Sequence, residues 1–115
     1  IPAMPGIGND IKKPGGDEHA YPKTPLRAAA SMMAAWKPLR ADLGRITAPL
    51  LFFKSAVDHV VDPSSQQLII DGVGSTDVTL RMLENSYHVA TLDNDAEAIF
   101  TESAEFIARV TAARA

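Results

Sequence analysis

The pattern of apolar and polar residues predicts two neighbouring strands in the second half of the chain. Pro49 is followed by the continuous apolar run LLFF, which is typical of a strand buried on both faces of a parallel sheet. In the next run Val78, Leu80 and Met82 alternate with their neighbours, as in a strand with two different faces.

A helix is expected between these two strands, at residues 63–71. Asp62 and Pro63 form a helix start, and Gly72 and Gly74 end the helix. Another helix follows the second strand, so the order is strand, helix, strand, helix. This order predicts a right-handed parallel crossover and therefore an α/β fold.

Two further helices complete the expected elements. Residues 25–36 are rich in alanine, with Thr24 as an N-cap and proline at the first helical position. Pro38 should break or kink this helix, and a shorter one follows it. The last helix, capped by Asp93 or Asn94, combines an apolar stripe with a charged face.

The first part of the chain predicts a connector rather than a packed unit. Residues 1–23 are dense in proline and glycine, which break helices and strands, so we expect a loop or extended arm. We therefore divide the chain into a connector with a helical cap or lid segment, residues 1–45, and a core portion, residues 46–115. Because the chain begins at isoleucine, we expect it to be part of a longer protein.

Composition narrows the classes of function. The chain has 115 residues, 46% hydrophobic and 22% charged, with a net charge of −3 and mixed signs. No basic patch suggests nucleic-acid binding, and no apolar stretch approaches the roughly 20 residues that span a bilayer, so no stable membrane insertion is expected. The absence of cysteine excludes disulfides and thiolate chemistry. We expect a cytoplasmic protein.

The candidate chemistry lies directly after the two strands. Asp58 follows the first strand and His88 follows the second, 30 positions later. Ligands bind beyond the carboxyl ends of parallel strands, so both side chains should meet there. A buried carboxylate that accepts the imidazole Nδ1–H leaves Nε2 free as general base and then acid. Asp58 and His88 are therefore candidates for two members of a hydrolase triad.

Other polar residues compete for these roles. Asp62, Asp93 and Asp95 are better explained as helix caps or first-turn acids. His59 should point away from Asp58 on the turn, as a surface residue or one that supports the site. The spacing of Asp58, His59 and Asp62 matches no metal-site signature, so we expect no metal and no cofactor.

The methionines and tryptophan of the first long helix allow two interpretations. Met32, Met33 and Trp36 could simply pack against the core. Alternatively, they form an adaptable apolar surface in a lid that contacts the acyl chain of a substrate. The second interpretation makes them candidate substrate-binding residues.

Three stretches of residues 47–110 are distinctive: TAPLLFFKSAVDHVVDP, RMLENSYHVATLDND and AEAIFTESAEFIARV. With them, residues 47–110 resemble the C-terminal part of the α/β-hydrolase fold, specifically bacterial carboxylesterases of the monoacylglycerol-lipase type. The upstream NDIKKPG and AYPKTPLRAA are similar to the small cap of that family. The resemblance implies that Asp58 is the triad acid and His88 the triad base. It also implies a small-molecule ester substrate and no cofactor.

The nucleophile of such an enzyme is not found in this chain. It occupies a G-x-S-x-G elbow upstream of the acid and base, and Ser75, which follows Gly-Val-Gly, does not fit that motif. Enzymes of this type need about 230 to 300 residues in one domain. We therefore expect a missing N-terminal half that carries the serine, as a second chain or fragment, and an inactive chain without it.

Two alternatives remain open at this point. An epoxide or haloalkane hydrolase would use the same fold and the same acid–base residues with an aspartate nucleophile. A non-catalytic half-fold would serve as a binding or assembly module with a vestigial Asp58 and His88. The residue at the missing elbow separates the first alternative from a serine esterase.

Overall fold

The centre of the fold is a pair of parallel strands. The computed structural model describes residues 2–112, and its strands β3 (Leu50–Ser55) and β4 (Val78–Leu83) pair in parallel from their first residues to their last. Both strands therefore end at the same edge, with Ser55 opposite Leu83. This arrangement confirms the predicted strands and the α/β class.

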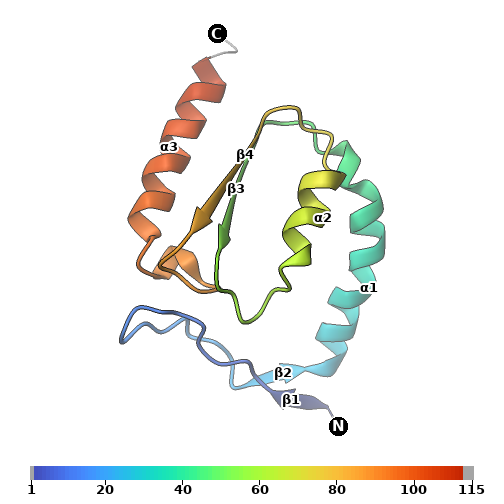
Figure 1. The fold of residues 1–115 in the computed structure, drawn as a ribbon. Helices are drawn as coiled ribbons and strands as arrows, with labels where there is room; N and C mark the ends of the chain where they lie inside the picture. The colour runs from blue at the N-terminus through green and yellow to red at the C-terminus, as the bar shows by residue number, and fades with distance from the viewer. Residues whose placement is uncertain (1, 113–115) are drawn as a thin grey trace.

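Helices flank the strand pair. The helical elements are α1 (Leu26–Asp42), η1 (Leu43–Arg45), α2 (Ser64–Gly72), η2 (Ala90–Leu92) and α3 (Ala96–Ala112). Figure 1 shows α3 on one side of β3 and β4, and α2 with α1 on the other. Helix α2 connects the two strands, and η2 lies in the connection between β4 and α3. The crossover that the sequence predicted is thus present.

The N-terminal arm is more ordered than its composition predicts. Within residues 1–23 the sequence predicted no regular structure, but β1 (Ala3–Pro5) pairs antiparallel with β2 (Lys23–Pro25). The Gly6 N–H donates to the Pro22 carbonyl at 3.0 Å where the short ladder ends. Prolines are tolerated here because a two-stranded ribbon has open edges that need no N–H donor. In Figure 1 this arm lies beneath the ends of β3 and β4.

Helix α1 differs from its prediction at both expected boundaries. Thr24 lies in β2 and Pro25 takes the N-cap position without a side-chain cap bond. The helix also continues through Pro38 instead of ending there. A proline removes one N–H donor, but this helix has no buried residue, so the freed carbonyl can bond to water while the surrounding alanines favour the helix.

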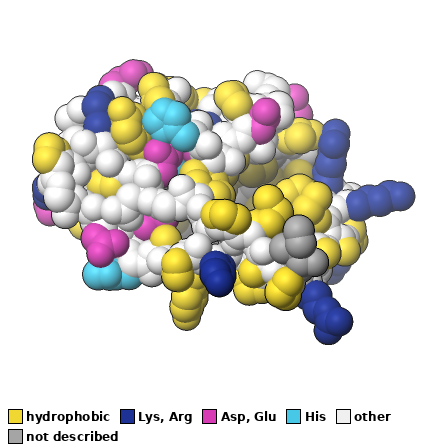
Figure 2. Space-filling model, turned by 90° about the horizontal axis from the view of Figure 1, so that it is seen from below, with side chains coloured by type: hydrophobic (Ala, Val, Ile, Leu, Met, Phe, Trp, Pro, Cys, Tyr) yellow, Lys and Arg dark blue, Asp and Glu magenta, His cyan; other side chains and the backbone are white. Residues whose placement is uncertain are grey.

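The core of the described residues is small. Leu83 and Ile99 are the buried hydrophobic side chains of residues 2–112, whereas Trp36, Met82 and Phe100 are among many large apolar side chains left exposed. On the face seen in Figure 2, hydrophobic side chains gather around a hollow. A two-stranded sheet with so little buried area needs further cover to be stable.

No helix within residues 2–112 combines the length and apolar character that a membrane crossing requires.

Candidate active site

Asp58 and His88 meet beyond the common edge of β3 and β4. Asp58 follows the end of β3 by three positions and His88 follows the end of β4 by five. The Nδ1 atom of His88 lies 3.2 Å from Oδ2 of Asp58. The structure therefore brings together the two residues that the sequence selected, in the pairing that orients an imidazole for proton transfer.

The Asp58 carboxylate is held by its own loop and by a lysine. Its Oδ1 accepts the backbone N–H groups of Val60 and Val61, each at 2.9 Å, and its Oδ2 lies 3.4 Å from Nζ of Lys54. Burial raises the pKa of Asp58, but the hydrogen bonds from Val61, Val60 and His88 outweigh it and lower the pKa well below 3.8. Asp58 is thus an anion at neutral pH.

The turn that carries His88 is fixed from three sides. The Ser55 hydroxyl donates to the Tyr87 carbonyl at 2.7 Å, and the Tyr87 N–H donates to Asp93 at 2.9 Å. The N–H of His88 itself donates to Oδ2 of Asp10 at 3.2 Å. The backbone of the candidate base therefore has little freedom to move.

Asp58 and His88 line a cavity of about 440 Å³. Phe52, Phe53 and Leu83 give most of it an apolar wall. Small-molecule sites are usually of this kind, with apolar walls and a few convergent polar groups. The cavity is large enough for a small ester next to the acid–base pair.

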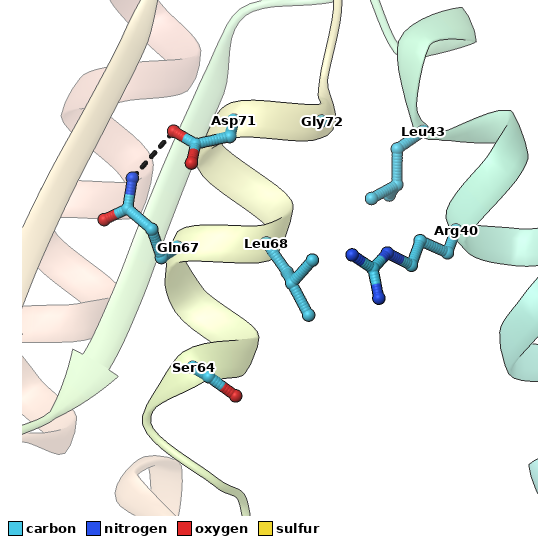
Figure 3. Close-up of a pocket in the computed structure, with 7 residues that line it drawn as sticks. All are labelled: Arg40, Leu43, Ser64, Gln67, Leu68, Asp71 and Gly72. Atoms are coloured by element: carbon cyan, nitrogen blue, oxygen red, sulfur yellow. Dashed lines mark hydrogen bonds between the residues drawn. The ribbon is translucent and has the colours of Figure 1, made fainter.

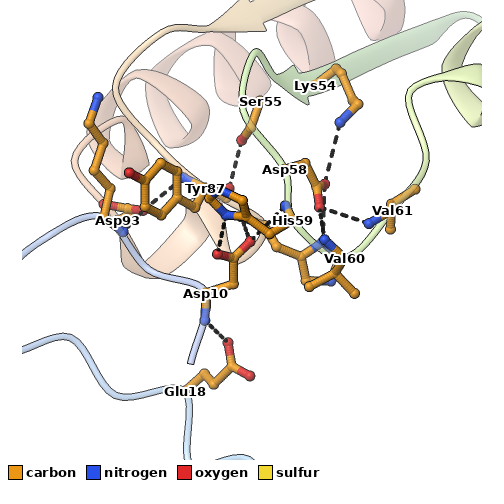
Figure 4. Close-up of polar contacts among 12 residues, drawn as sticks. Asp10, Glu18, Lys54, Ser55, Asp58, His59, Val60, Val61, Tyr87 and Asp93 are labelled. Atoms are coloured by element: carbon orange, nitrogen blue, oxygen red, sulfur yellow. Dashed lines mark hydrogen bonds and ion pairs between the residues drawn. The ribbon is translucent and has the colours of Figure 1, made fainter. Parts of the chain in front are cut away.

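A second aspartate–histidine pair, Asp10 and His59, lies beside Asp58 (Figure 4). Oδ1 of Asp10 is 2.7 Å from Nδ1 of His59, and the Asp10 side chain comes from the N-terminal arm, where sequence reasoning placed no functional residue. The His59 ring packs edge-on against Tyr87, with centroids 4.7 Å apart. The only sequence signal for Asp10 was its position in the NDIKK stretch that resembles a cap.

The competing aspartates differ in how well they match their predicted roles. Asp62 accepts the N–H and hydroxyl of Ser64 at the start of α2, as expected for a helix-start residue. Asp95 occupies the position before α3, but its carboxylate accepts the N–H of Asn85 and the hydroxyl of Ser86. Its side chain therefore braces the turn before His88 instead of capping the helix.

The prediction for Asp93 as a helix cap was wrong. Its buried carboxylate accepts N–H donors from Lys12 and Lys13, at 2.6 and 2.8 Å, and from Tyr87 and Asn94. Burial raises the pKa of Asp93, but these backbone hydrogen bonds outweigh it and lower the pKa overall. Asp93 fastens the N-terminal arm to the Tyr87 turn.

The candidate substrate residues lie away from the acid–base pair. Met32, Met33 and Trp36 are all more than half exposed, and none of them lines the cavity of Asp58 and His88. Trp36 instead lines an apolar groove of about 400 Å³ between α1 and α2, together with Leu39 and other residues.

An adjoining pocket of about 500 Å³ continues this groove. Figure 3 shows Arg40 of α1 and Leu43 of η1 facing Leu68 of α2 across it. On the α2 side, Gln67 donates a hydrogen bond to Asp71 at 2.7 Å.

The serines near the strand ends have other partners. Ser55 donates to the Tyr87 carbonyl, and Ser86 donates to Asp95 at 2.8 Å. Ser75, in the Gly-Val-Gly-Ser stretch, donates to the Ala48 carbonyl at 2.6 Å at the opposite end of the strands. None of these three hydroxyls is placed as a nucleophile for His88.

Residues 9–95 match the model of the protein family described as serine aminopeptidase, S33. The chain is 42% identical over 106 residues to a thermostable monoacylglycerol lipase of Bacillus sp. (strain H-257), covering 92% of this chain and 42% of that protein. It is 24% identical over 90 residues to a carboxylesterase of Bacillus subtilis (strain 168), covering 78% of this chain and 37% of that protein.

A solved structure from the two metagenome-derived lipolytic enzymes LipS and LipT superposes with a TM-score of 0.90 at 46% identity. It covers 95% of this chain, which in turn spans 44% of that protein. The chain thus has the partial fold of a lipolytic α/β-hydrolase. It spans about two fifths of the length of the curated relatives that it matches, 42% and 37%.

Proposed function

The chain belongs to the serine aminopeptidase S33 family of α/β-hydrolases, and on this basis we propose that it is the C-terminal portion of a serine carboxylesterase. Its substrates are carboxylic esters with short or medium acyl chains, including monoacylglycerols. The observation that carries the proposal is the 3.2 Å contact between His88 Nδ1 and Asp58 Oδ2 at the edge where two parallel strands end. The cytoplasmic location remains a prediction.

In the proposed reaction His88 moves the protons. A serine from outside this chain attacks the ester carbonyl while Nε2 of His88 removes its proton. The imidazolium is stabilised by the anionic Asp58 and returns the proton to the leaving alcohol. His88 then activates a water that hydrolyses the acyl-enzyme and regenerates the serine. No metal or cofactor enters these steps.

The remaining part of the site is proposed to come from an upstream half with the G-x-S-x-G nucleophile. The exposed apolar side chains and the two-stranded sheet support this proposal, because further strands would bury them. Residues 1–45 would then supply the cap, and residues 46–115 the last strands and helices of the core. The chain alone is expected to be inactive.

Met32, Met33 and Trp36 are proposed to contact the acyl chain from the cap. The apolar groove of about 400 Å³ that Trp36 lines supports this role. The proposed acyl contact is tested by measuring kcat/KM for esters of increasing acyl length. Trp36→Ala should lower kcat/KM for longer esters more than for acetates, whereas an equal effect on all lengths would contradict acyl contact.

The proposed function is tested by assembling the chain with the upstream segment that precedes it. We expect hydrolysis of p-nitrophenyl esters by the assembly and none by either part alone. Labelling with a fluorophosphonate should modify a serine of the upstream segment. A folded, complete assembly that hydrolyses no ester would contradict the proposal.

The same assembly separates the alternatives. The lipase and carboxylesterase among the relatives favour an ester hydrolase over an epoxide or haloalkane hydrolase. Turnover of an epoxide or haloalkane without serine labelling would support the aspartate nucleophile instead. Binding without any turnover would support the assembly module.

A further inference from the structure

One carboxylate of the N-terminal arm connects both loops of the acid–base pair. Asp10 is buried, and its Oδ2 accepts the backbone N–H groups of His59 and His88, each at 3.2 Å. His59 directly follows Asp58, and His88 is the base itself. A single side chain, 49 and 78 positions away from these partners, therefore sets the separation of the two loops.

We propose that Asp10 is a positioning residue that holds Asp58 and His88 at the distance that proton transfer requires. This inference rests on the proposed function, because it assigns a role to Asp10 in the chemistry of that same pair. Asp10 acts through the backbone and touches neither the substrate nor the reacting atoms. Its removal should affect the rate of the chemical steps more than substrate binding.

Asp10 is itself firmly placed, as a positioning residue must be. Its carbonyl accepts the Val89 N–H at 3.3 Å, so the arm contacts the His88 loop through backbone as well as side chain. Two residues further, the N–H groups of Lys12 and Lys13 donate to the buried Asp93. The arm segment of residues 10–13 therefore bridges the loops as one unit.

The charge of Asp10 suits this role. Burial raises the pKa of the Asp10 carboxyl, but the hydrogen bonds from His59 and His88 outweigh it and lower the pKa overall. An ionised carboxylate accepts on both oxygens and forms stronger hydrogen bonds than a neutral group. Replacing it by a methyl group would leave two backbone N–H groups without their partner.

The His59 ring makes the third contact of the Asp10 side chain. It does not serve as a second catalytic base. His59 and Asp10 do not line the cavity that contains Asp58 and His88. The His59 side chain is 57% exposed, and its ring packs against Tyr87. Its bond to Oδ1 of Asp10 fixes the carboxylate so that Oδ2 faces the two backbone donors.

The test uses Asp10→Ala and Asp10→Asn in the enzyme assembled with its upstream segment. Asp10→Ala removes all three contacts, and we expect kcat to fall about 100-fold, since a misplacement near 1 Å costs about that much, with little change in KM. Asn can keep its oxygen on both backbone donors and donate its amide to an unprotonated His59 Nδ1. Asp10→Asn should therefore restore most of the kcat.

Rates are divided by the folded fraction from circular dichroism, and Asp62→Ala is the matched control. Asp62 is an exposed aspartate of the neighbouring loop and contacts neither pair, so its kcat should not change. If Asp10→Ala does not fold, Asp10→Ser decides, because a hydroxyl is too short to reach both loops and should lower kcat.

The outcomes separate this inference from the proposed function. A folded Asp10→Ala or Asp10→Ser enzyme with wild-type kcat, next to an inactive His88→Ala enzyme, overturns the role of Asp10 alone. An active His88→Ala enzyme overturns the proposed function. A fall in kcat that Asp10→Asn reverses, without a matching change in KM, supports the positioning role.

Discussion

The two aspartate–histidine pairs of this chain have the same chemistry and different surroundings. Asp10–His59 has the shorter contact, 2.7 Å against 3.2 Å for Asp58–His88, so distance alone would select it as the active pair. Yet its Oδ2 is used by two backbone donors of remote loops, and the pair lies outside the apolar cavity. The location of a pair at the cavity, and the partners of the second carboxylate oxygen, therefore identify a candidate catalytic pair better than a short aspartate–histidine distance does.

Asp58 obtains its backbone bonds from its own loop and keeps its other oxygen for side chains. Val60 and Val61 satisfy Oδ1, which leaves Oδ2 to His88 and Lys54. Local backbone bonds fix the carboxylate without tying it to a second loop. This arrangement suits an orienting acid, whereas that of Asp10 suits a structural connection.

The largest expected difference between the pairs is in their histidines. His88→Ala should lower kcat of the assembled enzyme by roughly 10⁶-fold, as loss of a triad histidine does. His59→Ala removes one hydrogen bond of Asp10 and should change kcat by about 5-fold or less, because the backbone bonds to Asp10 remain and a single hydrogen bond contributes about 1 kcal/mol. Steady-state rates with a p-nitrophenyl ester measure both.

Equal losses from the two histidine variants would remove the distinction between the pairs. Circular dichroism must show that both variant proteins are folded. Each variant is then the control for the other, because both replace a histidine of an aspartate–histidine pair by alanine.

The next difference concerns the acids. Asp58→Asn should reduce kcat by about 10⁴-fold, since an amide no longer holds the correct tautomer or stabilises the imidazolium. Asp62→Asn makes the same change on the same loop without touching His88 and should leave kcat unchanged. An Asp58→Asn enzyme with wild-type turnover would show that another carboxylate supports His88.

The smallest difference between the pairs is expected in how the folding stability depends on pH. Here Asp10 and Asp58 should have effects of the same sign. The pKa values of Asp10 and Asp58 are both lowered from 3.8 in the folded chain, so the unfolded chain binds their protons first as the pH falls. Each carboxylate thus stabilises the fold fully above its unfolded pKa of 3.8 and loses that contribution as the pH falls through the folded pKa.

Urea unfolding of the assembled enzyme at several pH values between about 2 and 7 measures this effect. Asp10→Asn and Asp58→Asn should each flatten the loss of stability in acid. A variant with the full wild-type acid dependence would show that its carboxylate has an ordinary pKa in the folded protein.

The sequence predicted Asp58 and His88 because local rules place them. Asp58 follows a short apolar run and His88 an alternating run, both typical of strands, and parallel strands end at one edge. Asp10 was missed because it lies in a proline- and glycine-rich arm, where no periodicity indicates a position in space. Asp93 was mistaken for a cap because its donors Lys12 and Lys13 are about 80 positions away.

Helix α1 also shows how little the local sequence says about tertiary position. Alanine content predicted α1, but nothing local showed that Pro38 would remain inside the helix or that Met32 and Trp36 would lie outside the cavity of His88. Propensity is a weak guide where a helix has no buried face to fix its ends.

The division of roles between the pairs is tested most directly by the pH dependence of kcat/KM for the His59→Ala enzyme. Loss of activity can come from damage elsewhere, but the acid limb of this profile reports the protonation of the base in the free enzyme. We expect the limb of His59→Ala to coincide with that of the wild type, because His88 is still the base. A limb that disappears or shifts far from the wild type would identify His59 as the proton acceptor and contradict the assignment of His88.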